Sequence, residues 1–139
     1  MRLDTEYLDR TIRTLEEAFS LLQRQEPGSI AHDIYCAACV KEFELVEELC
    51  GSLLRKRIRP FFASNRDVDR LAFKDIFRHA AKHVLITADE CARWLQYCET
   101  RNESAHRYGE EYANDVLDAL PAFIADAQSL ASVIGQETP

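Results

Sequence analysis

The segment from Arg101 to Tyr108 brings together side chains that could do chemistry on a phosphodiester. Arg101 supplies a permanent cation, Asn102 an amide, His106 an imidazole and Tyr108 a phenol. On a helix that turns about 100° per residue, Asn102 and His106 lie about 40° apart, and Arg101 and Tyr108 about 20° apart. Four polar groups could therefore converge on one cleft.

These residues suit metal-independent cleavage of RNA by its own 2'-hydroxyl. That reaction needs a proton donor or acceptor, a cation for the charge that develops at phosphorus, and a group that holds the backbone. His106 lies in the last turn of an expected helix, where the helix dipole favours the imidazolium. Arg101 can make a forked contact with a phosphate, and Asn102 can position it. The ordinary alternative is a set of solvated charges at a helix end.

The hydrophobic pattern predicts an all-α protein that positions this segment. The 139 residues are 47% hydrophobic and 29% charged, with four Gly and four Pro, which fits one domain over 1–139 and disfavours a many-stranded fold. We expect an antiparallel four-helix bundle with an additional short helix. The expected helices cover about 7–22, 29 or 33 to 57, 67–84, 89–107 and 112–134.

One helix end, one proline and the last helix allow more detailed predictions. Gly109 is a plausible left-handed terminator of the fourth helix, and Pro121 should kink the last helix or start a new segment there. The last helix has the clearest apolar spacing in the chain. Its expected inner face consists of Tyr112, Val116, Leu120, Phe123, Ala127, Leu130 and Ile134.

The net charge of the chain disfavours some classes of binding partner. A formal net charge of −7 disfavours indiscriminate binding to nucleic acid or to anionic membranes, so we expect no DNA partner, no membrane partner and only local RNA contact. The run Arg55-Lys56-Arg57 could supply that contact, or it could only oppose the dipole of its own helix. The acidic residues, Glu47 and Glu48 among them, are expected to form a mostly solvated face.

Cysteines and histidines complete the candidates. No signal peptide and no membrane-length apolar run is visible, which predicts a cytoplasmic protein with five free thiols. Cys36 and Cys39 have zinc-like spacing, but no suitable second pair follows, and core thiols are favoured. His79 and His83 could bind a metal, yet no nearby acid completes a site. We therefore expect no metal and no cofactor.

The pattern Arg101-x4-His106-x-Tyr108, with a polar Asn directly after the Arg, resembles the Rx4HxY motif of HEPN proteins. It is most similar to the HepT-like branch, also described as nucleotidyltransferase substrate-binding proteins. The resemblance covers about residues 8–134.

Two further stretches extend the resemblance. Phe43-Glu44 and Glu48-Leu49 resemble the "RFE…FEL" stretch of the family's long helix, although Glu42 stands where a basic residue is common. The stretch 112–123 resembles the family's closing helix.

The resemblance implies a helical bundle that forms a homodimer, in which two motifs face one cleft. It implies that Arg101 and His106 carry metal-independent endoribonuclease activity, with Asn102 in support. It also implies a minimal nucleotidyltransferase partner that acts as antitoxin and adenylylates Tyr108, which blocks the cleft. The expected function is therefore the toxin of such a pair. The alternatives are a non-catalytic nucleotide- or substrate-binding subunit of a two-component nucleotidyltransferase, and a helical scaffold without a nucleotide role.

Overall fold

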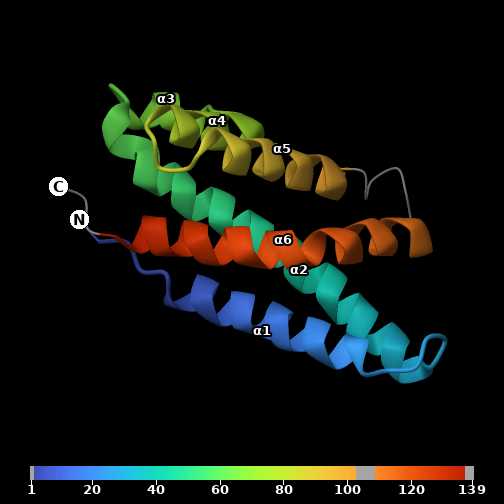
Figure 1. Ribbon diagram of the computed structural model, residues 1–139. Helices are drawn as coiled ribbons and strands as arrows, with labels where there is room; N and C mark the ends of the chain where they lie inside the picture. The colour runs from blue at the N-terminus through green and yellow to red at the C-terminus, as the bar shows by residue number, and fades with distance from the viewer. Residues whose placement is uncertain (1, 103–108, 137–139) are drawn as a thin grey trace.

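The computed structural model describes residues 2–102 and 109–136, and every regular element in that part of the chain is helical (Figure 1). The predicted all-α class is confirmed. Four of the described helices are long, and two are short. They are α1 (Glu6–Gln23), α2 (Ile30–Ile58), α3 (Asn65–Asp69), α4 (Phe73–Lys82), α5 (Ala88–Asn102) and α6 (Glu110–Gly135), with a 3-10 turn, η1, at Arg59–Phe61.

Side-chain caps explain where several helices begin. The Ser29 hydroxyl accepts the backbone N–H of His32 at 3.1 Å, which confirms the expected start of α2 near Ser29. Thr87 and Glu90 form a reciprocal capping box before α5. The Thr87 N–H donates to the Glu90 carboxylate at 2.9 Å, and the Glu90 N–H donates to the Thr87 hydroxyl at 3.0 Å.

The four long helices, α1, α2, α5 and α6, form the bundle, and α2 contacts each of the other three (Figure 1). Successive long helices run antiparallel along the chain, and the start of α1 lies beside the end of α6. The Arg2 side chain joins these ends, because its Nε donates to the Gly135 carbonyl at 3.1 Å. The opposite end of α6, where this helix begins, lies next to the last described turn of α5, which contains the first two residues of the candidate site.

The inner face predicted for the last helix is confirmed. All seven residues are buried, and six of them are at most 1% exposed. By length and composition α6 could also cross a membrane, but 44% of that apolar window is buried inside the bundle. The apolar character of α6 is thus explained by packing against α1, α2 and α5.

The structure differs from the helix prediction at two places. Pro121 does not start a new segment, because α6 continues through it to Gly135, whereas a kink at Pro121 stays a prediction. Pro121 is exposed, whereas Leu120 and Phe123 on either side are fully buried and anchor the helix. The expected helix over 67–84 is divided into α3 and α4. At this break the Arg55 guanidinium donates to the carbonyls of Val68 at 2.6 Å and Leu71 at 3.1 Å, and thus stabilises a helix end.

Val84 is the strained residue of the described chain. Its φ is 61°, and it is the only non-glycine residue with positive φ in the described ranges. It follows α4 in a Schellman motif, in which the Leu85 N–H donates to the Ala80 carbonyl at 2.9 Å and the Val84 N–H donates to the Ala81 carbonyl at 3.0 Å. Glycine is the usual residue at this position, because a Cβ crowds the left-handed backbone.

A Val84→Gly variant should therefore raise the free energy of unfolding by about 1 kcal/mol. Val84 is 86% exposed, so little apolar burial is lost with its side chain. Urea denaturation followed by Trp94 fluorescence measures the change. A Val84→Ala control keeps a Cβ at the same backbone angles and should gain less. An equal gain in both variants would show that backbone strain is not the cause.

Candidate functional site

The structure describes only part of the motif segment. Arg101 and Asn102 form the last described turn of α5, with Arg101 half-buried and Asn102 exposed. His106 and Tyr108, predicted to be the catalytic imidazole and the modified phenol, lie outside the described residues. The site is therefore built here from Arg101 and Asn102 and from the residues that contact them.

Arg101 contacts two glutamates of α2. Its Nη2 donates to Glu48 Oε2 at 3.3 Å, and its Nη1 lies 3.9 Å from Glu47 Oε1. The arginine side chain is 31% exposed, so water or a ligand can reach it. A guanidinium has five N–H donors, and these two contacts leave donors for a further anion. Contacts with α2 thus orient Arg101 but do not occupy all of its N–H donors.

Glu47 is the most unusual group of this site. The residue is only 1% exposed, and its Oε2 has no hydrogen-bond partner in the described part of the chain. Burial raises the pKa of Glu47 to about 8, the charge of Arg101 opposes this rise, and the neighbouring Glu44 and Glu48 add to it. The neutral acid is therefore favoured up to a higher pH than for an ordinary glutamate.

The expectation of a solvated acidic face was thus wrong for Glu47, whereas Glu48 is exposed. The helical period contained the necessary signal. Glu47 lies four residues after Phe43 and three before Cys50, and both of those residues are fully buried. A carboxylate on that face is buried with them.

A third glutamate of α2 holds the other described end of the motif region. The Tyr112 hydroxyl, in the first turns of α6, donates to Glu44 Oε2 at 2.8 Å. Burial and this hydrogen bond raise the pKa of Tyr112, so the phenol stays protonated. Glu44, Glu47 and Glu48, which we call the α2 acidic cluster, therefore contact residues on both sides of the segment 103–108.

The conformation of Gly109 differs from the expected helix terminator. Its φ is 75° and its ψ is −136°, which is not the left-handed helical region, and it is the N-cap of α6. Positive φ still explains a glycine here, because a side chain would strain this backbone.

The basic run of α2 does not present three side chains to one surface. Arg55 stabilises the end of α3 as described above, and Arg57 is only 8% exposed. Lys56 is exposed. RNA contact by this run stays a prediction, and Lys56 is the member best placed to make it.

Thiols and imidazoles have packing roles in the structure. All five cysteines are free, as predicted, and burial raises the pKa of Cys98 to about 12. His83 stacks on Phe61 with a ring-centroid distance of 4.0 Å, and His79 meets the edge of Phe62 at 4.9 Å. In the described part of the chain no group of three or more His, Cys, Asp or Glu residues is arranged to hold a metal ion.

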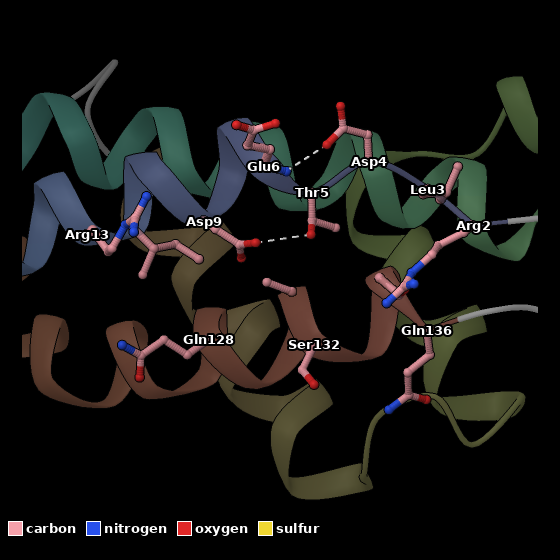
Figure 2. A pocket seen from close by; sticks show the side chains of 13 residues that line it. Arg2, Leu3, Asp4, Thr5, Glu6, Asp9, Arg13, Gln128, Ser132 and Gln136 are labelled. Atoms are coloured by element: carbon pink, nitrogen blue, oxygen red, sulfur yellow. Dashed lines mark hydrogen bonds between the residues drawn. The ribbon is translucent and has the colours of Figure 1, made fainter.

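Two grooves on the described surface bear on the site, and the larger of these two is far from Arg101. Figure 2 shows this groove of about 1020 Å³, where polar side chains from the start of the chain and from the end of α6 face one another. The second groove, of about 810 Å³, lies between the first half of α2 and the start of α6. Glu44 and Tyr112 line it, so it adjoins the α2 acidic cluster. Its position beside the motif region makes it the more relevant of the two.

The site thus lies in an all-helical bundle and contains an arginine in the last described turn of one helix. Residues 3–135 match the family described as "Nucleotidyltransferase substrate binding protein like", and the chain belongs to this family. It is 25% identical to a protein of Haemophilus influenzae named "Probable ribonuclease HepT", over 97% of this chain and 94% of that protein.

Solved structures show the same fold. A structure from Haemophilus influenzae, described as the fold of a substrate binding domain of a nucleotidyltransferase, has a TM-score of 0.80 and 25% identity, covering 96% of this chain and all of that one. A crystal structure from Thermus thermophilus has a TM-score of 0.72 at 19% identity, covering 93% of this chain and 99% of that one. The bundle is therefore shared over nearly the whole chain.

Proposed function

We propose that this protein is a HEPN-type, HepT-like toxin that cleaves RNA without a metal ion and is neutralised by a minimal nucleotidyltransferase. The observation that carries the proposal is the placement of Arg101 at the end of α5. Its guanidinium is oriented by the α2 acidic cluster and remains 31% exposed. Family membership and the name of the Haemophilus influenzae relative support the same reading.

In this proposal each residue of the motif has a distinct role. Arg101 binds the scissile phosphate and stabilises the charge that develops on it. The 2'-oxygen attacks phosphorus and the bond from phosphorus to the 5'-oxygen breaks. His106, as imidazolium, donates a proton to the leaving 5'-oxygen, water accepts the proton of the 2'-hydroxyl, and Asn102 holds the backbone. A nucleotide that the partner adds to Tyr108 would bring a phosphate that competes for Arg101. The toxin would then be blocked through the same cation that it uses for RNA.

The proposed assembly is a cytoplasmic homodimer with RNA rather than DNA as its substrate. Two copies of the segment from Arg101 to Tyr108 would face one cleft. The motif supports this assembly by its resemblance to HEPN proteins. The net charge of −7 favours binding of RNA phosphate at a few local cations and disfavours binding by a broad basic surface.

A second candidate function is a non-catalytic subunit that binds a nucleotide or another substrate for the nucleotidyltransferase. The observation that favours it is the groove of about 810 Å³, whose lining includes Val40 and Leu117 beside His32, Lys41 and Tyr112. This volume and this mixture of apolar and polar groups are typical of small-molecule sites. The family description and the wording used for the Haemophilus influenzae structure also support a substrate-binding role.

Cleavage of RNA by purified, unmodified protein tests the first function. In the presence of EDTA the wild type should cleave a fluorescent RNA, and Arg101→Ala and His106→Ala should each be at least about 100-fold slower. The product should carry a 2',3'-cyclic phosphate, because the 2'-hydroxyl is the nucleophile. Intact-mass analysis should confirm that Tyr108 carries no nucleotide before the assay.

A matched arginine serves as the control. Arg13 lines the larger groove at the other end of α6, and Arg13→Ala should cleave as fast as the wild type. If the wild type leaves RNA intact at the rate of His106→Ala, the nuclease proposal fails. Saturable nucleotide binding that survives the loss of His106 would then favour the second function.

A further inference from the structure

Glu47 is buried deeply enough to make its charge depend on its few neighbours. It is 1% exposed, and one of its carboxylate oxygens has no hydrogen-bond partner among the described residues. An ionised carboxylate in such a position is costly unless a cation compensates it. Arg101, 3.9 Å away, is the only cation that lies within ion-pair distance of it in the described chain.

Among the described residues, the other groups near Glu47 cannot replace Arg101. On α2 these are Glu44, Glu48 and the buried Cys50, and the two glutamates are of like charge. On α5 Cys98 accompanies Arg101, and on α6 the phenol of Tyr112 is bonded to Glu44. Glu47 and Arg101 are therefore electrostatically coupled across the α2–α5 contact.

We propose that Glu47 is the positioning residue of Arg101: as a carboxylate it draws the guanidinium toward α2, and as a neutral acid it leaves the guanidinium available to a phosphate. The proposal rests on the proposed function, since it concerns how Arg101 meets RNA. Glu47 lies outside the motif segment, and its protonation would control how strongly Arg101 binds phosphate.

The direction of the effect follows from charge. A phosphate at Arg101 competes with ionised Glu47 for the same cation, and it also repels a second negative charge nearby. Binding of RNA should therefore favour protonated Glu47. By linkage, a bound proton strengthens phosphate binding, and its loss weakens phosphate binding. Because the pKa of Glu47 is about 8, the change falls within an accessible range of pH.

The first test needs no RNA. The Nε–Hε resonance of Arg101, recorded by NMR from about pH 6 to about pH 9.5, should shift with a midpoint near that of Glu47. Glu47→Gln should abolish this transition, because the isosteric amide cannot ionise. Glu48→Gln removes the exposed partner of Arg101 and should keep the transition. The same transition in Glu47→Gln, or no transition in the wild type, would overturn the proposal.

The second test uses an RNA whose 2'-hydroxyls are methylated, so that it binds without being cleaved. The wild type should bind it about three- to tenfold more weakly at about pH 9.5 than at about pH 7, beyond any change seen in Glu47→Gln. Calorimetry at about pH 8.5, in two buffers that differ in ionisation enthalpy, should detect proton uptake by the wild type only. A merely structural role for Glu47 would not produce this proton uptake.

A Glu47→Met variant is a second control in case Glu47→Gln does not fold, since methionine has a similar size and packs without charge. It should behave as Glu47→Gln does. Failure of the proposed function is separable from failure of the inference. If the Arg101 resonance follows Glu47 but the wild type binds no RNA, the RNA proposal fails. If RNA binds through Arg101 with one pH profile in wild type and Glu47→Gln, the role of Glu47 is refuted.

Discussion

A Phe123→Ala variant should lose about 3–5 kcal/mol of unfolding free energy. Phe123 of α6 is fully buried. Its ring lies 4.7 Å from Phe43 of α2, and 5.6 Å and 5.0 Å from Trp94 and Tyr97 of α5, measured between ring centroids. Alanine would leave a cavity where three helices meet, and none of them can move inward without losing its other contacts.

Urea denaturation followed by circular dichroism measures this loss. Trp94 is the only tryptophan, so a red shift of its emission should report water or mobility at the same cavity. Phe123→Leu is the matched control, because it keeps most of the apolar volume and should cost less than about 1.5 kcal/mol. A cost below about 1 kcal/mol for Phe123→Ala would mean that the aromatic cluster does not hold the three helices together.

Loss of the Asp126 carboxylate should also have a large effect, about 2–4 kcal/mol for Asp126→Ala. Asp126 of α6 is 6% exposed. It accepts two hydrogen bonds from Arg93, at 2.8 and 2.9 Å, and one from the Tyr97 hydroxyl at 2.6 Å. Without it the buried phenol loses its partner, whereas Arg93, whose side chain is 45% exposed, can turn to water.

The same carboxylate should make stability depend on acid. Burial alone raises the pKa of Asp126, but the hydrogen bonds from Arg93 and Tyr97 and the charge of Arg93 outweigh burial, and the net pKa is lowered. Protons therefore bind the unfolded chain first. The contribution of Asp126 is fully present above the unfolded pKa of about 3.9 and is lost as the pH falls through the lower folded value.

Unfolding measured between about pH 2 and pH 6 checks this dependence. Asp126→Asn should be less stable than the wild type at pH 6, and the difference should shrink in acid. Asp118→Asn, an exposed aspartate on the same helix, is the control and should follow the wild-type curve. A constant difference between Asp126→Asn and wild type across this range would show that the charge of Asp126 is not what stabilises the α5–α6 contact.

Local patterns in the sequence determined much of the fold. The apolar spacing of the last helix predicted its inner face, because a helical period places residues three and four apart on one side. The sequence left the start of α2 open between residues 29 and 33, and the Ser29 cap decided for the first. At Pro121 the local rules allowed a new segment, but α6 is continuous there, and the buried Leu120 and Phe123 anchor it despite one missing donor.

The sequence also contained the chemistry of the candidate site but not its supports. One short segment contains all four candidate residues, Arg101, Asn102, His106 and Tyr108. Their spacing alone predicts their relative angles on a helix. The tertiary structure decided what holds that segment. Arg101 meets Glu47 and Glu48 from 53 or more residues away, and Tyr112 meets Glu44 from 68 residues away.

Those pairings depend on how α5 and α6 cross α2. A helical period tells which face of each helix is buried, but not which turn of one helix lies opposite which turn of another. Helix crossing also decided that Arg55 stabilises the end of α3, and that Gly51 leaves room for the Phe73 ring, whose Cε2 would lie 1.9 Å from an added Cβ. The sequence alone thus determined which groups could act, and the packing of distant helices decided which partners orient them and which charge Glu47 carries.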